Sequence, residues 1–420
     1  MQRSTVKRSR RAARAWCSAW LALLLLAGAP SLALAQDAAT STVVPDAIGG
    51  VPVSENAAFA AAVPDVETPA GILMTSTGLV LWERDADSER AMASTTKMMT
   101  ALVAIENAEI SDVVTITIAA AKIGESGIPL AAGSTMTVEE LLEATLVHSA
   151  NNAAFALAEY VGGDSVKFVK MMNVRAEELG MTHTHFTNPH GLDQEGHHTS
   201  ARDLATLARA AMANEQFAAL AGTDSVTIRS KTYENTNALI GSYEGATGVK
   251  TGFTGDAGYC VVASAQRNGI ALVAVVLGAE SEAGRFDDAE TVLDWGFEHY
   301  AAARLVTVES TAALVPVSNY LDQTVAAVVS ETVAMPVFDL GGAITIDVAV
   351  PEEVPAPVQA GDELGTLTVM QGTTVLAEVP LVAAASVRKP DAAMAMKIWF
   401  TRLWRGVFGG TMQANAVAVM

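Results

Sequence analysis

Ser94 and Lys97 stand three residues apart in the stretch "AMASTTKMMTA". On a helix, residues at i and i+3 share a face, so these two side chains can touch. A serine hydroxyl is a poor nucleophile at neutral pH and needs a base beside it. A desolvated lysine near another cation can lose its proton and become that base. The pair is compatible with acyl transfer, but a Ser-x-x-Lys spacing taken alone also arises by chance.

Two further triplets give this pair its meaning. "HSANN" contains Ser149-Ala150-Asn151 at the junction of two predicted helices, and "GVKTGFT" contains Lys250-Thr251-Gly252 in a predicted strand that ends in a turn. They supply the hydroxyl, amide and ammonium groups that a Ser–Lys acyl transfer needs around it. The three triplets occur in the order that is typical of penicillin-binding proteins and class A β-lactamases.

Longer segments extend the likeness. They are "ASTTKMMTA", "MTVEELLEATLVHSANNAAFALAEYVGG", "FVKMMNVRAEELGMTHTHFTNPHGLD", "SARDLA", "GVKTGFTGDAGYCVVASA" and "RFDDAETVLDWGF". Over roughly residues 70–410, the chain resembles the low-molecular-weight penicillin-binding D-alanyl-D-alanine carboxypeptidases (peptidase family S11). The resemblance implies hydrolysis of peptidoglycan stem peptides that end in D-Ala-D-Ala, acylation by β-lactam antibiotics, and no cofactor or metal.

The resemblance also implies roles for the motif residues. Ser94 would accept the acyl group, and Lys97 would act as its base. Ser149 would relay a proton towards the departing amine. Asn151 would hydrogen-bond the substrate peptide, and Lys250 would add positive charge and assist the relay.

A second group of residues would hold the end of the substrate. By the same resemblance, Thr251 and Arg285 would bind the terminal carboxylate, with Gly252 completing this part of the site. Arg285 fits because it stands ten residues before the Trp of "RFDDAETVLDWGF", as in the family. The oxyanion hole would consist of the backbone N–H groups of Ser94 and Phe253, because a tetrahedral oxyanion needs two preset donors.

The chain departs from the family at four positions. Asn152 stands where Asp is usual, which puts local hydrogen bonding in doubt more than activity. Phe253 replaces the His that some members carry and would tune substrate preference. Met92 stands where Pro is common, and Thr75 where Asp is common; both differences are interpreted as structural.

The elements around the motifs predict an α/β (α+β) fold. "GILMTSTGLVLWERDAD" reads as a hairpin, "TVEELLEATLVHSANNAAFALAEYVGG" as two helices, and "TGVKTGFTGDAGYCVVASAQRNGIALVAVVLGA" as three strands. Thr137 and Glu140 form a plausible capping box. Helices in the middle, with strands before and after, favour a β-lactamase/transpeptidase-like domain that has one central antiparallel sheet, its first hairpin and last strands paired.

The remaining segments suggest five regions. The N-terminal segment is basic and is followed by a short apolar run and small residues. This pattern predicts a signal peptide that is cleaved between Ala35 and Gln36. Export by the Sec route is ranked ahead of the twin-arginine route. Val- and Thr-rich runs after residue 301 indicate a small all-β domain. We therefore expect a signal peptide (1–35), a flexible linker (36–69), a catalytic domain (70–300), a β-rich domain (301–386) and an anchoring tail (387–420).

The tail is amphipathic. On a helix, "KIWFTRLWRGVFGG" gathers its aromatic and aliphatic residues on one face and its basic residues on another. This pattern is typical of a helix that lies in a membrane interface; packing against the β-rich domain is the alternative. We expect the protein at the periplasmic face of the cytoplasmic membrane, or at another extracytoplasmic membrane surface.

Composition excludes some partners. The chain has 26 lysines and arginines against 46 aspartates and glutamates, which argues against nucleic-acid binding. Cys260 is the one cysteine outside the predicted signal peptide, so no internal disulfide is expected.

Three other functions remain as alternatives. Five histidines between His183 and His198 could suggest a zinc peptidase, but their spacing fits no standard zinc motif. A class A β-lactamase needs a glutamate in an E-x-x-L-N context, and none follows Asn151. A protein that only binds peptidoglycan is the third alternative.

Overall fold

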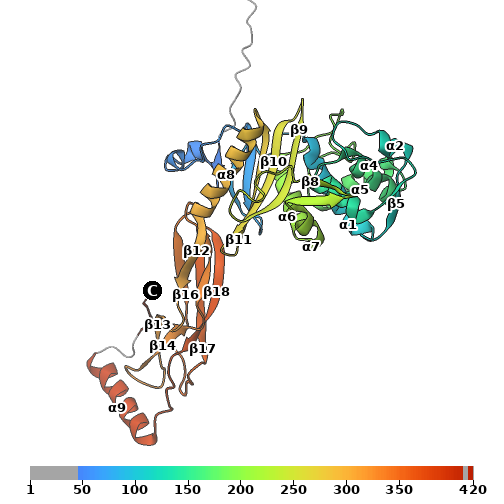
Figure 1. Ribbon diagram of the computed structural model, residues 1–420. Helices are drawn as coiled ribbons and strands as arrows, with labels where there is room; N and C mark the ends of the chain where they lie inside the picture. Colours follow the sequence, from blue (N-terminus) through green and yellow to red (C-terminus); the bar gives the residue numbers. More distant parts are fainter. Residues whose placement is uncertain (1–45, 410–414, 420) are drawn as a thin grey trace, which may run out of the picture. The chain divides into compact units, whose positions relative to one another are not determined.

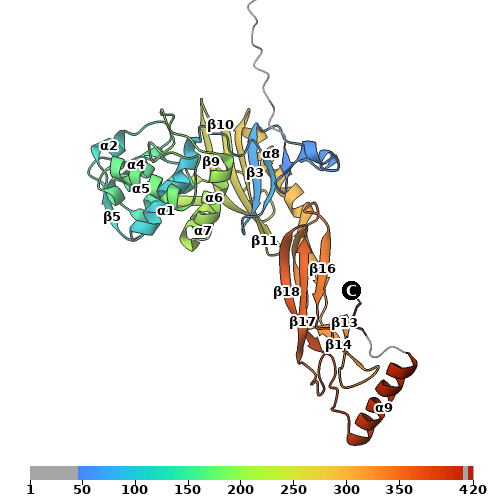
Figure 2. The ribbon, with the colours of Figure 1, turned by 180° about the vertical axis from the view of Figure 1, so that it is seen from behind.

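The computed structural model describes residues 46–409 and 415–419. The predicted signal peptide and its cleavage site lie outside the described residues. Along the chain, an α/β part comes first, and an all-β part and a C-terminal helix follow it (Figures 1 and 2). The fold class predicted from the sequence is confirmed.

A seven-stranded antiparallel sheet forms the centre of the α/β part (Figure 1). Its middle strands are rich in Val, Ala, Ile and Leu and are buried on both faces. The first hairpin pairs with the last strand through β3 and β11, as predicted. In spatial order the strands are β2 (Val51–Pro52), β1 (Ala47–Ile48), β4 (Val80–Arg84), β3 (Ala70–Thr75), β11 (Ile270–Ala279), β10 (Gly258–Arg267) and β9 (Ala246–Thr254).

The segment before residue 70 contributes to this sheet. Strand β1 pairs with β4, and the Arg84 guanidinium donates a hydrogen bond to Asp46 at 2.7 Å. Phe59 and Val66 bury their side chains in the core on one side of the sheet. Two 3₁₀ turns lie here, η1 (Val53–Glu55) and η2 (Phe59–Ala61). The described part of the expected linker, residues 46–69, thus carries short elements of its own.

Helices cover both faces of the sheet (Figures 1 and 2). Helix α8 buries Ala289, Val292 and Leu293 on one face, and α1 and α6 belong to the larger core on the other. The helices are α1 (Lys97–Asn107), α2 (Ile118–Lys122), α3 (Val138–Leu146), α4 (Asn151–Gly162), α5 (Ser165–Glu178), α6 (Ala201–Met212), α7 (Glu215–Ala221) and α8 (Glu282–His299). Two small hairpins complete this part: β5 (Val113–Thr115) with β6 (Thr135–Thr137), and β7 (Ser225–Ile228) with β8 (Lys231–Glu234).

Local sequence explains where these helices begin. The predicted capping box is confirmed, because Glu140 N–H donates to Thr137 Oγ1 at 3.1 Å and Thr137 N–H donates to Glu140 Oε2 at 2.9 Å. Side-chain oxygens also cap the N-termini of α5, α6, α7 and α8, from Asp164, Ser200, Asn214 and Ser281. The helix α4 begins directly at Asn151, so the second triplet stands at a helix start.

The all-β part contains a six-stranded sheet and a two-stranded one. Alternating valines and leucines, such as Leu367 and Val369, form its separate core. The larger sheet runs β16 (Ile344–Ala349), β17 (Glu363–Gln371), β18 (Thr374–Ala383), β14 (Thr324–Val329), β13 (Thr311–Pro316) and β19 (Val417–Ala418). The smaller sheet pairs β12 (Tyr300–Val306) with β15 (Val333–Phe338).

The predicted tail helix is α9 (Ala392–Phe408). Its Ile398 is buried, and Arg402 donates a 2.6 Å hydrogen bond to the Ser318 carbonyl. Its aromatic residues are exposed, including Trp399 and Trp404. Within the described residues, no helix combines the length and the apolar character that a membrane crossing requires.

Candidate active site

Ser94 and Lys97 lie at the junction of the 3₁₀ turn η3 (Ala93–Thr96) and α1. In a 3₁₀ turn, side chains at i and i+3 eclipse each other, which places the lysine directly against the serine. Lys97 Nζ lies 2.7 Å from Ser94 Oγ. Ser94 is partly exposed, whereas Lys97 is fully buried. The serine can therefore meet a substrate while the lysine is withheld from water.

Two more oxygens surround the Lys97 amine. Lys97 Nζ donates hydrogen bonds of 2.7 Å to Asn151 Oδ1 and to the His190 carbonyl oxygen. Both oxygens can only accept hydrogen bonds. A neutral amine has two N–H groups and one lone pair. When these two oxygens take its N–H groups, the lone pair is left for the Ser94 hydroxyl.

Burial and charge favour this neutral amine. Burial lowers the pKa of Lys97 well below its ordinary value, and the positive charge of Lys250 adds to the effect. The Glu125 carboxylate acts in the opposite direction and more weakly. A lysine in this environment is suited to act as a base rather than as a cation.

The loop between α5 and α6 supplies the His190 carbonyl. Asn188 Oδ1 accepts hydrogen bonds from the backbone N–H of His190 and of Gly191, at 3.2 and 2.7 Å. Gly191 has a φ of +93°, and a Cβ at this position would stand 1.9 Å from the carbonyl oxygen of Ala93. A glycine is therefore required for the loop to lie directly against the residue before Ser94.

The second triplet is held by a neighbouring loop. Asn151 Nδ2 donates to the Gly124 carbonyl at 3.0 Å, which turns its Oδ1 towards Lys97. Asn152 exchanges hydrogen bonds with both backbone groups of Ile128, so an amide fits here, since it both donates and accepts. Ser149 is buried at a φ of +64°, and its hydroxyl makes no hydrogen bond to another described residue.

The third triplet lies on the edge strand β9. Lys250 is fully buried, and its Nζ donates to the Thr251 carbonyl at 3.2 Å and to Thr236 Oγ1 at 3.4 Å. Burial, and then the positive charge of Arg285, lowers the pKa of Lys250 to about 7. Thr251 Oγ1 donates to Thr236 Oγ1 at 2.7 Å. Near neutral pH, Lys250 is thus poised between its charged and neutral forms.

Gly252 connects this strand to the nucleophile. A Cβ at Gly252 would stand 2.9 Å from the backbone nitrogen of Ser94, so only glycine allows this approach. Phe253 follows with an exposed ring that packs against Tyr259, with 4.3 Å between ring centroids and an angle of 33° between the ring planes. Because β9 is the edge strand of its sheet, one side of its backbone faces η3 rather than another strand. The first and third triplets therefore meet through their backbones.

Arg285 is close to the third triplet but largely buried. Its Nη1 donates to the Gly252 carbonyl at 3.2 Å, and its Nη2 pairs with Glu282 at 3.0 Å. The guanidinium also lies over the rings of Phe286 and Tyr259. Arg285 therefore positions the backbone of β9 and contributes positive charge behind it.

Sequence reasoning missed Thr236 and the His190 carbonyl. Thr236 lies between Asn235, which donates to the Thr223 carbonyl, and Asn237, which donates to the Gly248 carbonyl. The Asn235-Thr236-Asn237 triplet was the one sequence feature that could have indicated Thr236, because asparagine side chains on both sides can hold a loop by hydrogen bonds to backbone carbonyls. A backbone carbonyl such as that of His190 carries no signal in residue type.

Two histidines of this region, His190 and His197, are buried within the protein. His197 hydrogen-bonds with Thr96 Oγ1 at 2.8 Å and accepts from Thr187 N–H. Burial lowers the pKa of both His190 and His197 to about 4, so both are neutral at pH 7. In the described part of the chain, no group of three or more His, Cys, Asp or Glu is placed to hold a metal ion.

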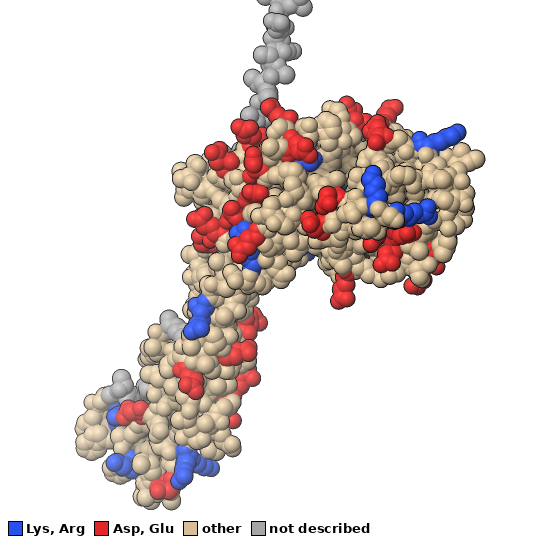
Figure 3. Space-filling view, in the orientation of Figure 1, with Lys and Arg blue, Asp and Glu red and all other residues tan. Residues whose placement is uncertain are grey.

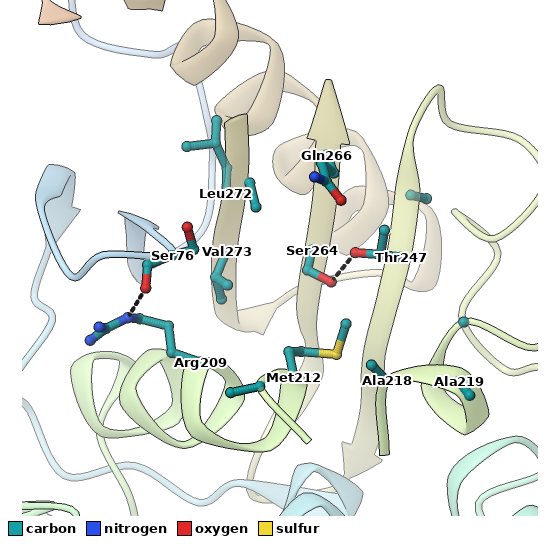
Figure 4. Close-up of a pocket in the computed structure, with 14 residues that line it drawn as sticks. Ser76, Arg209, Met212, Ala218, Ala219, Thr247, Ser264, Gln266, Leu272 and Val273 are labelled. Carbon is teal, nitrogen blue, oxygen red and sulfur yellow. Dashed lines mark hydrogen bonds between the residues drawn. The ribbon is translucent and has the colours of Figure 1, made fainter. Parts of the chain in front are cut away.

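A cavity of about 590 Å³ lies elsewhere, between α6, α7 and strands β9–β11 (Figure 4). Alanines form much of its wall, and none of the motif residues lines it. Two hydrogen bonds join polar groups of its wall: Thr247 with Ser264 at 2.7 Å, and Arg209 Nε with the Ser76 carbonyl at 3.0 Å. This cavity is separate from the Ser94 site.

Comparisons with known proteins agree with this geometry. A family model described as D-alanyl-D-alanine carboxypeptidase (peptidase S11) matches residues 57–281. Over 331 residues, the chain is 35% identical to D-alanyl-D-alanine carboxypeptidase DacF of Bacillus subtilis. The aligned region covers 76% of this chain and 85% of DacF. The chain belongs to the S11 D-alanyl-D-alanine carboxypeptidase family. This family consists of serine hydrolases, so the resemblance found in the sequence is confirmed.

Further relatives span both parts of this S11 protein. Residues 303–389 match a model of the penicillin-binding protein 5 C-terminal domain. D-alanyl-D-alanine carboxypeptidase DacD of Salmonella typhimurium is 34% identical, with 79% of this chain and 89% of that protein covered. Penicillin binding protein 6B of Escherichia coli has a similar structure, with 28% identity, a TM-score of 0.61, and 76% and 96% of the two chains covered.

Proposed function

We propose that this S11 family member removes the terminal D-alanine from peptidoglycan pentapeptide stems through an ester on Ser94. The contact that carries the proposal is Lys97 Nζ at 2.7 Å from Ser94 Oγ, with its two N–H groups directed at Asn151 and His190. This arrangement gives the serine a base that is neutral before the reaction begins.

The acylation step follows from these positions. Ser94 Oγ attacks the carbonyl carbon between the two D-alanines while its proton passes to Lys97. The backbone N–H groups of Ser94 and Phe253 stabilise the negative oxygen of the tetrahedral intermediate. When the C–N bond breaks, Ser149 passes its hydroxyl proton to the amine of the departing D-alanine and takes up the proton that Lys97 received from Ser94, so that both groups return to their starting states. Water then hydrolyses the ester and restores the serine.

The terminal carboxylate is proposed to bind at the β9 end of the site. Lys250, Thr251 and Arg285 supply donors and positive charge there. Thr236 adds a further donor: its oxygen accepts from both Lys250 and Thr251, so its own hydroxyl hydrogen is left for the carboxylate. Penicillins carry a carboxylate and a reactive amide in a related arrangement, so they are expected to acylate Ser94.

We expect the purified protein to release free D-alanine from a pentapeptide that ends in D-Ala-D-Ala and to hydrolyse penicillin only slowly. The Ser94→Ala variant is expected to lose both D-alanine release and covalent penicillin labelling, because no other described group occupies the nucleophile position. D-alanine release is measured by a coupled oxidase assay and labelling by intact mass. Rapid penicillin hydrolysis without D-alanine release would indicate a β-lactamase instead.

We propose that α9 attaches the exported enzyme to the periplasmic face of the cytoplasmic membrane. Its large apolar side chains are exposed, and Lys397, Arg402 and Arg405 supply positive charge on the same helix. In the view of Figure 3, basic side chains gather around this helix, whereas acidic ones predominate over the α/β part. An exposed aromatic face with basic residues beside it suits the boundary between lipid headgroups and acyl chains.

Truncation before Lys397 is expected to release the protein from the membrane fraction. A full-length variant with Trp399→Ser and Trp404→Ser is expected to bind anionic vesicles about tenfold more weakly or worse, because aromatic burial drives interfacial binding. Vesicle sedimentation measures both. The matched control carries Val113→Ser and Ile118→Ser, which remove apolar residues of similar exposure (62% and 65%, against 63% and 60%) from the α/β part. Membrane retention of the truncated chain would contradict the anchor.

A further inference from the structure

Glu125 lies in the loop that follows α2, and this loop is hydrogen-bonded to the second triplet. Its two neighbours are both bound to Asn151: Asn151 N–H donates to the Ser126 carbonyl at 2.8 Å, and Asn151 Nδ2 donates to the Gly124 carbonyl at 3.0 Å. Asn151 in turn contacts Lys97. The backbone on either side of Glu125 is therefore held by the residue proposed to bind the substrate peptide.

The backbone of Glu125 adopts a conformation that few side chains tolerate. Its φ is +68°, in the left-handed region that favours glycine. Two other non-glycine residues with positive φ belong to the site: Ala93 (+48°), directly before Ser94, and Ser149 (+64°). Such conformations concentrate at functional sites, where the surrounding structure holds them. A glutamate is an unfavourable residue for this backbone conformation, which points to a use for its carboxylate.

The Glu125 carboxylate points to no partner among the residues that the structure describes. Its side chain is exposed, and it makes no hydrogen bond or ion pair with another described residue. It does act electrostatically on Lys97, raising the pKa of that group against the larger effect of burial. The carboxylate is therefore within electrostatic range of the Ser94 site and remains free to bind a cation.

The direction of the bound stem indicates which cation this is. The terminal carboxylate is proposed to bind at Lys250 and Thr251, and the peptide before the scissile bond at Asn151. The residue that precedes the two D-alanines then extends past Asn151 towards the loop of Glu125. An exposed carboxylate at this place favours a cationic side chain on that residue. A diamino acid supplies such a cation as long as its second amine is not acylated.

We propose that Glu125 binds the free side-chain ammonium of the diamino acid before D-Ala-D-Ala, so that the enzyme prefers stems that are not cross-linked through this amine. This inference rests on the proposed carboxypeptidase function and specifies its substrate. Acylation of the amine, which is what cross-linking does chemically, removes the positive charge and the ion pair with Glu125.

Two synthetic peptides test this preference directly. One is Nα-acetyl-L-Lys-D-Ala-D-Ala, which keeps its side-chain ammonium, and the other is the Nα,Nε-diacetyl peptide, which lacks it. The wild-type protein is expected to cleave the first with a kcat/KM about fivefold higher, the upper range for a partly exposed ion pair. Glu125→Gln is expected to bring the ratio of the two values close to one.

Two further variants make the test specific. Glu125→Asn removes the charge with a residue that tolerates the left-handed region, so its ratio should also approach one without added backbone strain. Glu177→Gln removes an exposed carboxylate from α5 and should keep the wild-type ratio.

The outcomes separate this inference from the function on which it rests. D-alanine release from both peptides at equal efficiency by the wild type, or an unchanged ratio in Glu125→Gln, overturns the role of Glu125 and leaves the carboxypeptidase proposal standing. No D-alanine release from either peptide contradicts both proposals. Loss of the preference in Glu125→Gln and Glu125→Asn, with retention in Glu177→Gln, supports the assignment.

Discussion

Lys97→Ala is expected to slow acylation by benzylpenicillin by about a thousandfold, and D-alanine release with it. General-base catalysis contributes about 10² to 10⁴ in rate, and Lys97 is the one amine hydrogen-bonded to Ser94 in the described structure. In the wild type, the acylation rate should fall as the pH drops through the lowered pKa of Lys97, because protonation removes the lone pair that accepts the serine proton. Stopped-flow or quenched labelling with a fluorescent penicillin measures these rates.

Lys97→Arg separates basicity from positive charge. The guanidinium stays protonated because its pKa lies far above that of an amine, so this variant should be as slow as Lys97→Ala. Lys122→Ala, at an exposed lysine on α2, is the control that should keep the wild-type rate. Near wild-type acylation in Lys97→Arg would mean that Lys97 acts as a cation and that another group takes the proton.

Gly191→Ala is expected to reduce acylation by about a hundredfold or more and to destabilise the fold by about 3 kcal/mol. The added Cβ would stand 1.9 Å from the Ala93 carbonyl oxygen, so either the loop or the turn that carries Ser94 must move. Movement of the loop also withdraws the His190 carbonyl from Lys97. Penicillin labelling rates and thermal unfolding measure the two effects.

Gly196→Ala is the matched control for this change. Gly196 lies in the same loop with a φ of +78°, and the nearest atom to an added Cβ is a Thr187 methyl at an ordinary 3.8 Å. This variant carries the same backbone strain without the collision. It should lose some stability and keep most of its acylation rate. Equal loss of acylation in both variants would show that the close approach to Ala93 is not what matters.

The short-range parts of this site were predictable from the sequence. The three-residue spacing of Ser94 and Lys97 predicts their contact whether the segment is an α-helix or the observed 3₁₀ turn, because both place i and i+3 on one side. The capping box at Thr137 also follows a local rule. Strand order was predictable only in outline, from the hydrophobic runs at the two ends of the α/β part.

The long-range parts were not predictable in the same way. The His190 carbonyl reaches Lys97 because Asn188 folds the loop and Gly191 allows it to approach Ala93, and residue types alone do not specify a backbone carbonyl. Arg285 was expected near the third triplet, and it is there. Its burial and its pairing with the Gly252 carbonyl depend on how α8 packs on the sheet, which periodicity does not reveal.

Intact-protein mass spectrometry after brief exposure to benzylpenicillin detects whether a covalent ester forms at Ser94. The wild-type protein should gain the mass of one penicillin, with the modified peptide mapping to Ser94, and Ser94→Ala should gain nothing. A wild-type protein that remains unmodified, or a Ser94→Ala variant that is labelled to the same extent, would contradict the assignment of Ser94 as the nucleophile.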